Sequence, residues 1–304
     1  MVSRLPALPQ AIASACLCLL IASPARAAEA GAWEAFPSKD NSDAWTVLDY
    51  SVQPDGDFFY PQWFDDQGDG FAYFYHTNNA PLIFFTDVAN NAGGGKLVGN
   101  YLTENIAAIH ADILIDSLPD FDGVDCIVYA NGPAGERVYY SEVFFDTDFP
   151  ESGWYSLRFS FTDKWYYINT LGAFTAVSVT PQMLANIEVV GFRFFPKTSA
   201  TGELVAAIDN IKLEPKLTPP PITTATTGGN FSMSFTPGKG VTCSVEKQDP
   251  APLFGWSVIA EAFDVTGTTP FTYSTPIDTT QVREIFRVSY DPIYTSFVTP
   301  PVGP

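Results

Sequence analysis

The most constraining feature of this 304-residue sequence is an alternation of apolar and polar side chains that recurs over most of its length. The run WYSLRFSF at residues 154–161 is one example: every second side chain from Tyr155 to Phe161 is apolar, whereas Ser156 and Arg158 are polar. Successive side chains of a β-strand point to opposite faces, so such a run has one face in a core and the other in water. This is the pattern of an antiparallel sandwich.

Similar runs fill the first two thirds of the chain. An aromatic content of 15% and 25 prolines also favour strands and turns over helices. A domain over residues 31–216 is therefore predicted, an all-β sandwich of the jelly-roll type, with one short helix starting at Pro181 behind a Thr180 cap. The nine predicted strands are 45–52, 71–77, 82–88, 106–118, 124–129, 137–145, 154–161, 187–195 and 204–213.

Changes in composition divide the rest of the chain. Residues 217–229 are rich in Pro, Thr and Gly and poor in core-forming side chains, which predicts an extended linker. Short alternating runs return over residues 230–290 and predict a smaller β-sandwich of five to seven strands, similar to a fibronectin type III domain. Residues 291–304 are proline-rich and are expected to form a loose tail.

The first 27 residues have the organisation of a signal peptide. Arg4 precedes an apolar run at residues 11–22, and Ala25 and Ala27 provide the small side chains of a cleavage site after residue 27. The apolar run is too short to span a bilayer as a helix. We therefore expect an exported protein, secreted, periplasmic or on the cell surface, that is not inserted in a membrane after cleavage.

Charge and cysteine content narrow the classes of partner. The formal net charge is −19, and it becomes −21 once Arg4 and Arg26 leave with the signal peptide. Such a charge repels nucleic acid and anionic membranes and favours cations or neutral sugars. The two remaining cysteines, Cys126 and Cys243, each sit between valines at alternating positions, which predicts two buried, unpaired thiols in separate cores.

Two segments together resemble a family of bacterial exported proteins. Residues 207–213, AIDNIKL, match the last strand of laminin-B-like or carbohydrate-binding-module-like jelly rolls, which has the form xxLDNIxL. Residues 230–289 resemble the small fibronectin-III-like domain that often follows, although Cys243 and Ile285 stand where that domain usually has aromatic residues. The resemblance implies an exported binding module that contacts polysaccharide or cell-surface glycan.

The resemblance also implies a structural calcium ion. In such jelly rolls the aspartate of the last strand often binds calcium together with acidic residues of the first segment. Here Asp209 would be joined by Glu34, Asp40 or Asp43, since calcium takes six to eight oxygen ligands. The alternative is that Asp209 only hydrogen-bonds a neighbouring loop.

Sugar binding requires aromatic rings and polar groups together on a wet sheet face, because C–H faces of sugars stack on rings and hydroxyls pair with side chains. We expect a non-catalytic face that binds neutral carbohydrate weakly. The alternatives are a purely structural or adhesive surface protein and a glycan-active hydrolase or lyase, although no G-x-S-x-G motif is present. The predicted ligand-binding residues, all opposite core positions in their strands, are His110, Asp112, Tyr129, Trp154, Arg158 and Arg193.

Overall fold

A computed structural model describes residues 28–50, 56–65, 70–76, 80–198, 200, 204–248, 256–264, 267–277 and 284–296. The predicted signal peptide, residues 1–27, lies outside these ranges. No helix within them is both long enough and apolar enough to cross a membrane.

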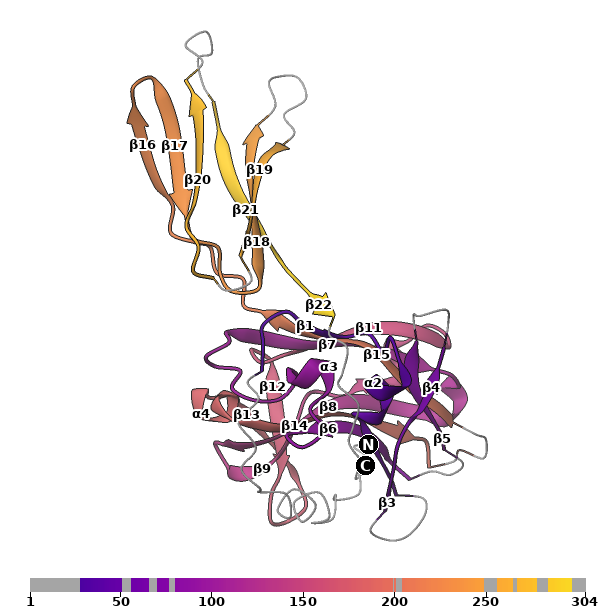
Figure 1. Ribbon diagram of the computed structural model, residues 1–304. Helices are drawn as coiled ribbons and strands as arrows, with labels where there is room; N and C mark the ends of the chain where they lie inside the picture. The colour runs from indigo at the N-terminus through magenta and orange to yellow at the C-terminus, as the bar shows by residue number, and fades with distance from the viewer. Residues whose placement is uncertain are drawn as a thin grey trace. The chain divides into compact units, whose positions relative to one another are not determined.

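The chain divides into two compact units. Unit 1 comprises residues 1–213 and 296–304, and unit 2 comprises residues 214–295. Both are built from antiparallel strands (Figure 1), so the prediction of an all-β protein is confirmed. The jelly-roll and fibronectin-III strand orders stay predictions.

One sheet of unit 1, called sheet A, has the strand order β11-β7-β15-β1-β22, with β5 beside β15 and β4 beside β5. Long β15 is its centre, because β7 lies on one side while β5 and β1 share the other. The strands are β1 (Ala32–Glu34), β4 (Gln62–Phe64), β5 (Phe71–His76), β7 (Ile106–Ile115), β11 (Gly153–Ser160), β15 (Leu204–Pro215) and β22 (Thr295–Ser296).

The other sheet of unit 1, called sheet B, has the order β13-β12-β9-β8-β14-β6-β2-β3, with β10 beside β8. Its strands are β2 (Thr46–Asp49), β3 (Asp57–Phe59), β6 (Leu82–Asp87), β8 (Phe121–Gly132), β9 (Gly135–Tyr140), β10 (Phe144–Phe145), β12 (Lys164–Ile168), β13 (Phe174–Ser178) and β14 (Ile187–Pro196).

The main core of unit 1 lies between the two sheets. Phe159 of sheet A lies 5.8 Å, between ring centroids, from Phe192 of sheet B, and Phe192 stacks on Trp45 at 6.1 Å. These rings belong to one buried cluster that includes side chains of both sheets. Each of the nine runs predicted before residue 216 contributes a strand. Within residues 31–216, the strands that the sequence did not predict are β1, β3, β4, β12 and β13, and the predicted run 137–145 is divided between β9 and β10.

Helical segments are short. They are α2 (Lys39–Asp43), α3 (Ala92–Gly95), α4 (Pro181–Ala185) and the 3₁₀ turns η1 (Leu118–Asp120) and η2 (Asp146–Asp148). The predicted helix at Pro181 is confirmed as α4, and the Thr180 side chain accepts a hydrogen bond from the Met183 N–H at 3.3 Å. This is the bond by which an N-cap satisfies a free donor in the first turn.

Unit 2 consists of two three-stranded sheets. Sheet C has the order β16-β17-β20 and sheet D the order β19-β18-β21. Met233 and Phe235 of sheet C pack with Val241, Cys243 and Val245 of sheet D in one buried cluster, so the two sheets form a small sandwich. The strands are β16 (Thr223–Thr227), β17 (Asn230–Phe235), β18 (Val241–Gln248), β19 (Trp256–Asp264), β20 (Phe271–Pro276) and β21 (Phe286–Pro292).

The cysteine prediction is confirmed, because Cys126 and Cys243 are both free and buried, one in the core of each unit. The boundaries of the second domain differ from the prediction. Residues 223–227, expected in the linker, form β16, which the Gly228–Gly229 turn joins to β17. Both glycines have positive φ, 61° and 81°, as a tight hairpin turn requires.

The tail also begins later than expected. β21 extends to Pro292, and residues 295 and 296 form β22. The remaining part of the predicted loose tail, residues 297–304, lies outside the described residues.

Candidate functional site

The face of sheet A that points away from the core contains four of the six predicted ligand-binding residues. In the pairing of β7 with β11, Arg158 lies opposite His110, and Trp154 lies opposite Leu114. Asp112 is on the same face, opposite Ser156. The intervening residues Tyr155, Leu157 and Phe159 pack on the core. The alternation of the sequence therefore places these four side chains correctly relative to the core.

A chain of hydrogen bonds crosses this face from strand to strand. The Trp33 Nε1–H donates to Asn210 Oδ1 at 2.9 Å, and Asn210 Nδ2 donates to Asp112 Oδ2 at 3.0 Å. The Ser156 hydroxyl donates to Asp112 Oδ1. The four residues belong to β1, β15, β7 and β11, so their polar groups are held in fixed positions across most of the sheet. Asn210 has a φ of 50°, which asparagine tolerates better than most residues.

Aromatic side chains form a cluster beside these polar groups. The Trp154 and Phe71 rings meet edge to face with centroids 5.2 Å apart, and Phe64 stacks on Phe71 at 4.9 Å. Tyr73 lies 6.0 Å from Phe71, and Tyr75 lies 5.5 Å from Tyr73. Trp154, Phe64 and Tyr75 are 43%, 48% and 46% exposed. We call these five side chains the aromatic cluster.

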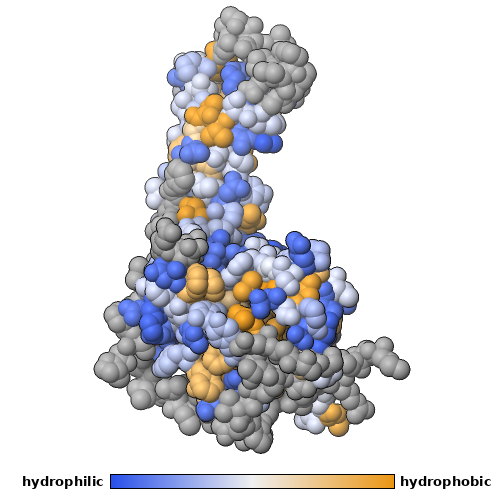
Figure 2. Space-filling view, turned by 90° about the vertical axis from the view of Figure 1, so that its right-hand side faces the viewer, coloured by the Kyte–Doolittle hydropathy of each residue, from blue (hydrophilic) through white to orange (hydrophobic). Residues whose placement is uncertain are grey.

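Figure 2 views the molecule from the side on which β4 and β5 lie in Figure 1, and on unit 1 it shows hydrophobic residues gathered among hydrophilic ones.

The sequence analysis did not identify Trp33, Phe64 or the aromatic residues of β5 as part of a site. The segment FAYFY at residues 71–75 is apolar or aromatic throughout, so its alternation does not distinguish an inner from an outer face.

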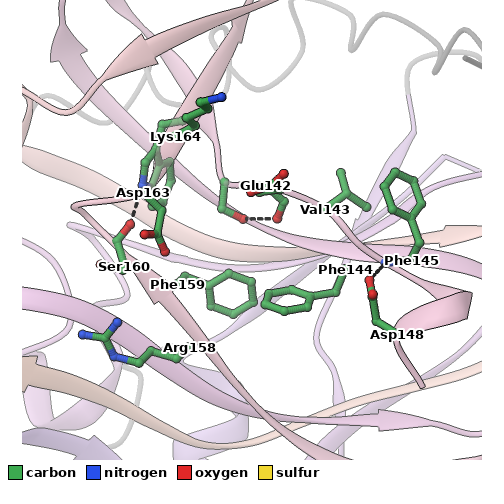
Figure 3. A pocket seen from close by; sticks show the side chains of 12 residues that line it. Glu142, Val143, Phe144, Phe145, Asp148, Arg158, Phe159, Ser160, Asp163 and Lys164 are labelled. Atoms are coloured by element: carbon green, nitrogen blue, oxygen red, sulfur yellow. Dashed lines mark hydrogen bonds between the residues drawn. The ribbon is translucent and has the colours of Figure 1, made fainter. Parts of the chain in front are cut away.

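A pocket of about 370 Å³ lies at the edge strand of sheet A, beside Arg158 (Figure 3). The Phe144 and Phe159 rings meet edge to face in it, with centroids 5.7 Å apart. Buried Trp165 donates its Nε1–H to the Ser160 carbonyl at 3.0 Å. Arg158 belongs both to the pocket and to the outer face of sheet A. The charged side chains lining the pocket are Glu142, Asp148, Arg158, Asp163 and Lys164.

The two other predicted ligand-binding residues, Tyr129 and Arg193, are on the outer face of sheet B, and the expectation that they lie in water is wrong. Arg193 is 1% exposed, its Nε donates to Asp125 Oδ1 at 3.1 Å, and its Nη2 donates to Asp125 Oδ2. Its guanidinium lies 4.3 Å from the ring centroids of both Tyr140 and Phe195.

Tyr129 is 6% exposed, and its hydroxyl donates to Glu136 at 3.2 Å. A second hydrophobic cluster explains this burial. It contains Leu48, Ile83, Ile127 and Tyr140, on the side of sheet B opposite the main core. Burial there raises the pKa of Tyr140 to about 12.

The four predicted calcium ligands do not come together. Glu34 is fully buried, and its carboxylate accepts N–H groups from Phe36 at 3.1 Å, Asn41 Nδ2 at 2.7 Å and Gly93 at 2.7 Å. These donors point at the lone pairs that a cation would need. Asp209 instead accepts hydrogen bonds from Asn210, its neighbour in the chain.

The other two carboxylates are in α2, where Asp43 pairs with Lys39 at 2.6 Å and Asp40 is exposed. Among the residues that the structure describes, no group of three or more His, Cys, Asp or Glu side chains is placed to hold a metal ion. The predicted ligands are therefore not grouped as a calcium site in this structure, and calcium binding stays a prediction of the sequence.

Comparison with known proteins gives partial structural likenesses only. No protein-family model matches the chain, and no curated protein matches it in sequence. The N-terminal CBM22-1-CBM22-2 tandem domain from Paenibacillus barcinonensis Xyn10C is 10% identical with a TM-score of 0.33, and the match covers 90% of this chain and 93% of that one.

Two larger structures match in part. A β-1,2-glucanase from Parabacteroides distasonis is 7% identical with a TM-score of 0.31, and the match covers 90% of this chain and 39% of that one. An exo-β-agarase is 10% identical with a TM-score of 0.31, and the match covers 57% and 25% of the two chains. This chain thus spans less than half the length of either protein. Likenesses at this level assign neither a ligand nor a role, so the function rests on the geometry of the site itself.

Proposed function

We propose that unit 1 is a non-catalytic module that binds neutral carbohydrate on the outer face of sheet A. The observation that carries this proposal is the position of the Trp154–Phe71 ring pair beside the hydrogen-bonded Asn210, Asp112 and Ser156. A sugar offers an apolar C–H face and a rim of hydroxyls, and both kinds of partner are present here within one sheet face.

The polar groups suit recognition by direct hydrogen bonds. Their orientation is fixed before binding, because Asn210 links the Trp33 indole to the Asp112 carboxylate. A preorganised group loses little side-chain entropy when a ligand arrives. The face is nevertheless open, so we expect weak binding of a polymer segment rather than burial of a small molecule.

The charge of the chain favours an uncharged ligand. A net charge of −19 repels polyanions such as nucleic acid and acidic membranes at long range. Stacking and neutral hydrogen bonds do not depend on long-range attraction, so a neutral polysaccharide meets no such barrier. In this proposal the protein acts after export, in the periplasm, at the cell surface or outside the cell.

The test is binding of the full chain to an array of neutral glycans, followed by affinity electrophoresis with the polysaccharide that binds. Trp154→Ala should abolish retardation and leave the fold intact, because the ring is on the wet side of β11. Tyr166→Ala is a matched control, since it removes a partly buried aromatic ring from the outer face of sheet B and should leave binding unchanged. A wild-type chain that binds no neutral glycan would favour a purely structural surface protein.

A glycan-active enzyme is the second candidate, and the pocket beside Arg158 favours it. Glu142, Asp148 and Asp163 place three carboxylates around one cavity, and glycosidases use two. Incubating the chain with each polysaccharide that it binds, followed by chromatography for shorter products, tests this candidate. Product that is lost in an Asp163→Asn or Glu142→Gln variant would establish catalysis and overturn the non-catalytic proposal.

A further inference from the structure

Strand β16 of unit 2 is an edge strand without charged residues. It has the sequence TTATT at residues 223–227, and all five residues are exposed. Among the described strands it pairs with β17 on one side only, at the margin of sheet C (Figure 1). An edge strand presents unpaired N–H and C=O groups to any strand that can reach them, and natural proteins usually block it with charge or proline.

The other edge strands of unit 2 have such protection. β19 contains Glu261 and β21 contains Arg287, while β20 ends in Pro276. β16 has no charge or proline in a chain whose net charge is −19. The residues beside it on the outer face of sheet C are also uncharged: Ser232 and Ser234 of β17 and Thr272 and Ser274 of β20.

The sequence of β16 is a palindrome, since TTATT reads the same in both directions. If two copies pair antiparallel about Ala225, Thr223 lies opposite Thr227 of the second copy and Thr224 lies opposite its Thr226. The two residues of each pair differ in position by two or four, and residues an even number apart in a strand point to the same face. Paired side chains therefore lie on the same face of the combined sheet. Threonine side chains directly opposite each other across antiparallel strands stabilise the pairing.

The flanking residues limit the pairing to this length. Pro221 lies two positions before β16 and has no N–H to donate, whereas the Gly228–Gly229 turn follows it directly. In the same register exposed Ile222 lies over Gly228 of the other copy, and the space around Gly228 is open. Two-fold pairing also uses the same edge of both copies, so the assembly closes as a dimer rather than growing into a fibre.

We propose that two copies of this chain associate through antiparallel pairing of β16, so that sheet C continues across the two-fold axis as one six-stranded sheet. The contact is small, which makes the dimer weak and dependent on concentration. Its strength should increase with salt, because salt screens the repulsion between two strongly acidic chains. Pairing would bring two copies of unit 1 into one assembly and raise the avidity for any polymeric ligand.

Sedimentation equilibrium of the full chain over a concentration series tests the proposal at low and high salt. Wild type should pass from monomer to dimer as concentration increases. Ala225→Lys should remain monomeric, since the two introduced lysines would face each other across the axis. Ser274→Lys is the matched control: it adds the same charge on the same outer face and in the same row of paired residues, but at the opposite edge, and it should dimerise as wild type does.

A second variant keeps the test decisive if Ala225→Lys unfolds unit 2. Ala225→Cys should form a disulfide-linked dimer on mild oxidation, whereas Ser274→Cys should not, and the native thiols Cys126 and Cys243 are buried. A chain that stays monomeric at every concentration overturns the proposal. So does a dimer that survives Ala225→Lys, or one that Ser274→Lys disrupts equally.

Discussion

The outer faces of sheets A and B of unit 1 differ in what lies on them. On sheet A the predicted site residues opposite the core are half-buried or exposed, as with Asp112 and the 43% exposed Trp154. On sheet B the corresponding positions form a second hydrophobic cluster, in which Ile83 and Ile127 are as buried as the main core. Period-two alternation identifies the side chains that point away from one core, but it does not show whether water or a second cluster lies beyond them.

This difference explains which of the predicted site residues are exposed and which are buried. Arg158 and Arg193 occupy equivalent places in the sequence pattern, each between apolar residues of a strand. Arg158 is exposed on sheet A, whereas Arg193 is paired with Asp125 between the rings of Tyr140 and Phe195. The face of sheet B is covered because side chains of β12 and β13, including Tyr166, Ile168 and Phe174, pack against its cluster.

The two arginines should show the largest difference between the faces in how much a substitution lowers the free energy of unfolding. Arg193→Ala should lower the free energy of unfolding of unit 1 by about 3–5 kcal/mol, because it leaves the Asp125 carboxylate buried without its partner. Arg158→Ala should change it by no more than about 0.5 kcal/mol, since the side chain is exposed. Urea denaturation followed by tryptophan fluorescence measures both.

A double variant separates the cost of the unpaired charge from the value of the pair. Arg193→Leu combined with Asp125→Leu should recover most of the stability lost in Arg193→Ala, because replacing a buried ion pair by apolar side chains is often neutral or stabilising. Equal losses in Arg193→Ala and Arg158→Ala would contradict the contrast between the faces.

Truncation of apolar side chains should also destabilise unit 1 more on the outer face of sheet B than on that of sheet A, with a smaller difference than for the arginines. Ile127→Ala, in the cluster on sheet B, should cost about 3 kcal/mol, because it removes buried methyl groups and leaves a cavity. Leu114→Ala, on the outer face of sheet A opposite Trp154, should cost about 1 kcal/mol, because water can reach the vacated space. If the two losses are similar, the outer face of sheet A is not wet at this position.

The strands and the core side of each were largely predictable from sequence, whereas the site was predictable only in part. The run around Leu157 alternates strictly, and it became β11 with the expected inner face, whereas the run around Ile208 became a strand although Asp209 and Asn210 interrupt its alternation. The strands β3, β4 and β13 are three to five residues long, too short for alternation to stand out. The Trp33–Asn210–Asp112 bonds join residues up to 177 positions apart, and only the sheet order brings them together.

The hydrogen bonds that join Trp33, Asn210 and Asp112 on sheet A should affect both binding and stability. Asn210→Ala removes the donors and acceptor that connect Trp33 with Asp112 and places alanine at a φ of 50°, so it should cost about 1–2 kcal/mol of stability. Carbohydrate affinity should decrease about tenfold, because Asp112 loses an orienting partner. Asn210→Gly relieves the backbone strain but not the lost bonds, so it should recover stability without recovering affinity. Recovery of both would show that the network does not orient the site.

The smallest expected effect is that of salt on carbohydrate binding. Exposed Trp154 and Tyr75 offer stacking surfaces, and the Asp112–Asn210 pair offers short-range hydrogen bonds, none of which is screened as a long-range ion pair is. The affinity for a neutral polysaccharide should therefore change by less than about twofold between low salt and roughly 1 M salt, where charges are screened within a few ångströms. Isothermal titration at several salt concentrations measures this directly. The salt dependence distinguishes this binding mode from two others. An anionic ligand bound by Arg158 and Lys164 would lose affinity steeply as salt increases. A polycation attracted by the net charge of −19 would lose even more affinity. A steep decrease would move the binding site from the aromatic cluster to the charged rim of the pocket.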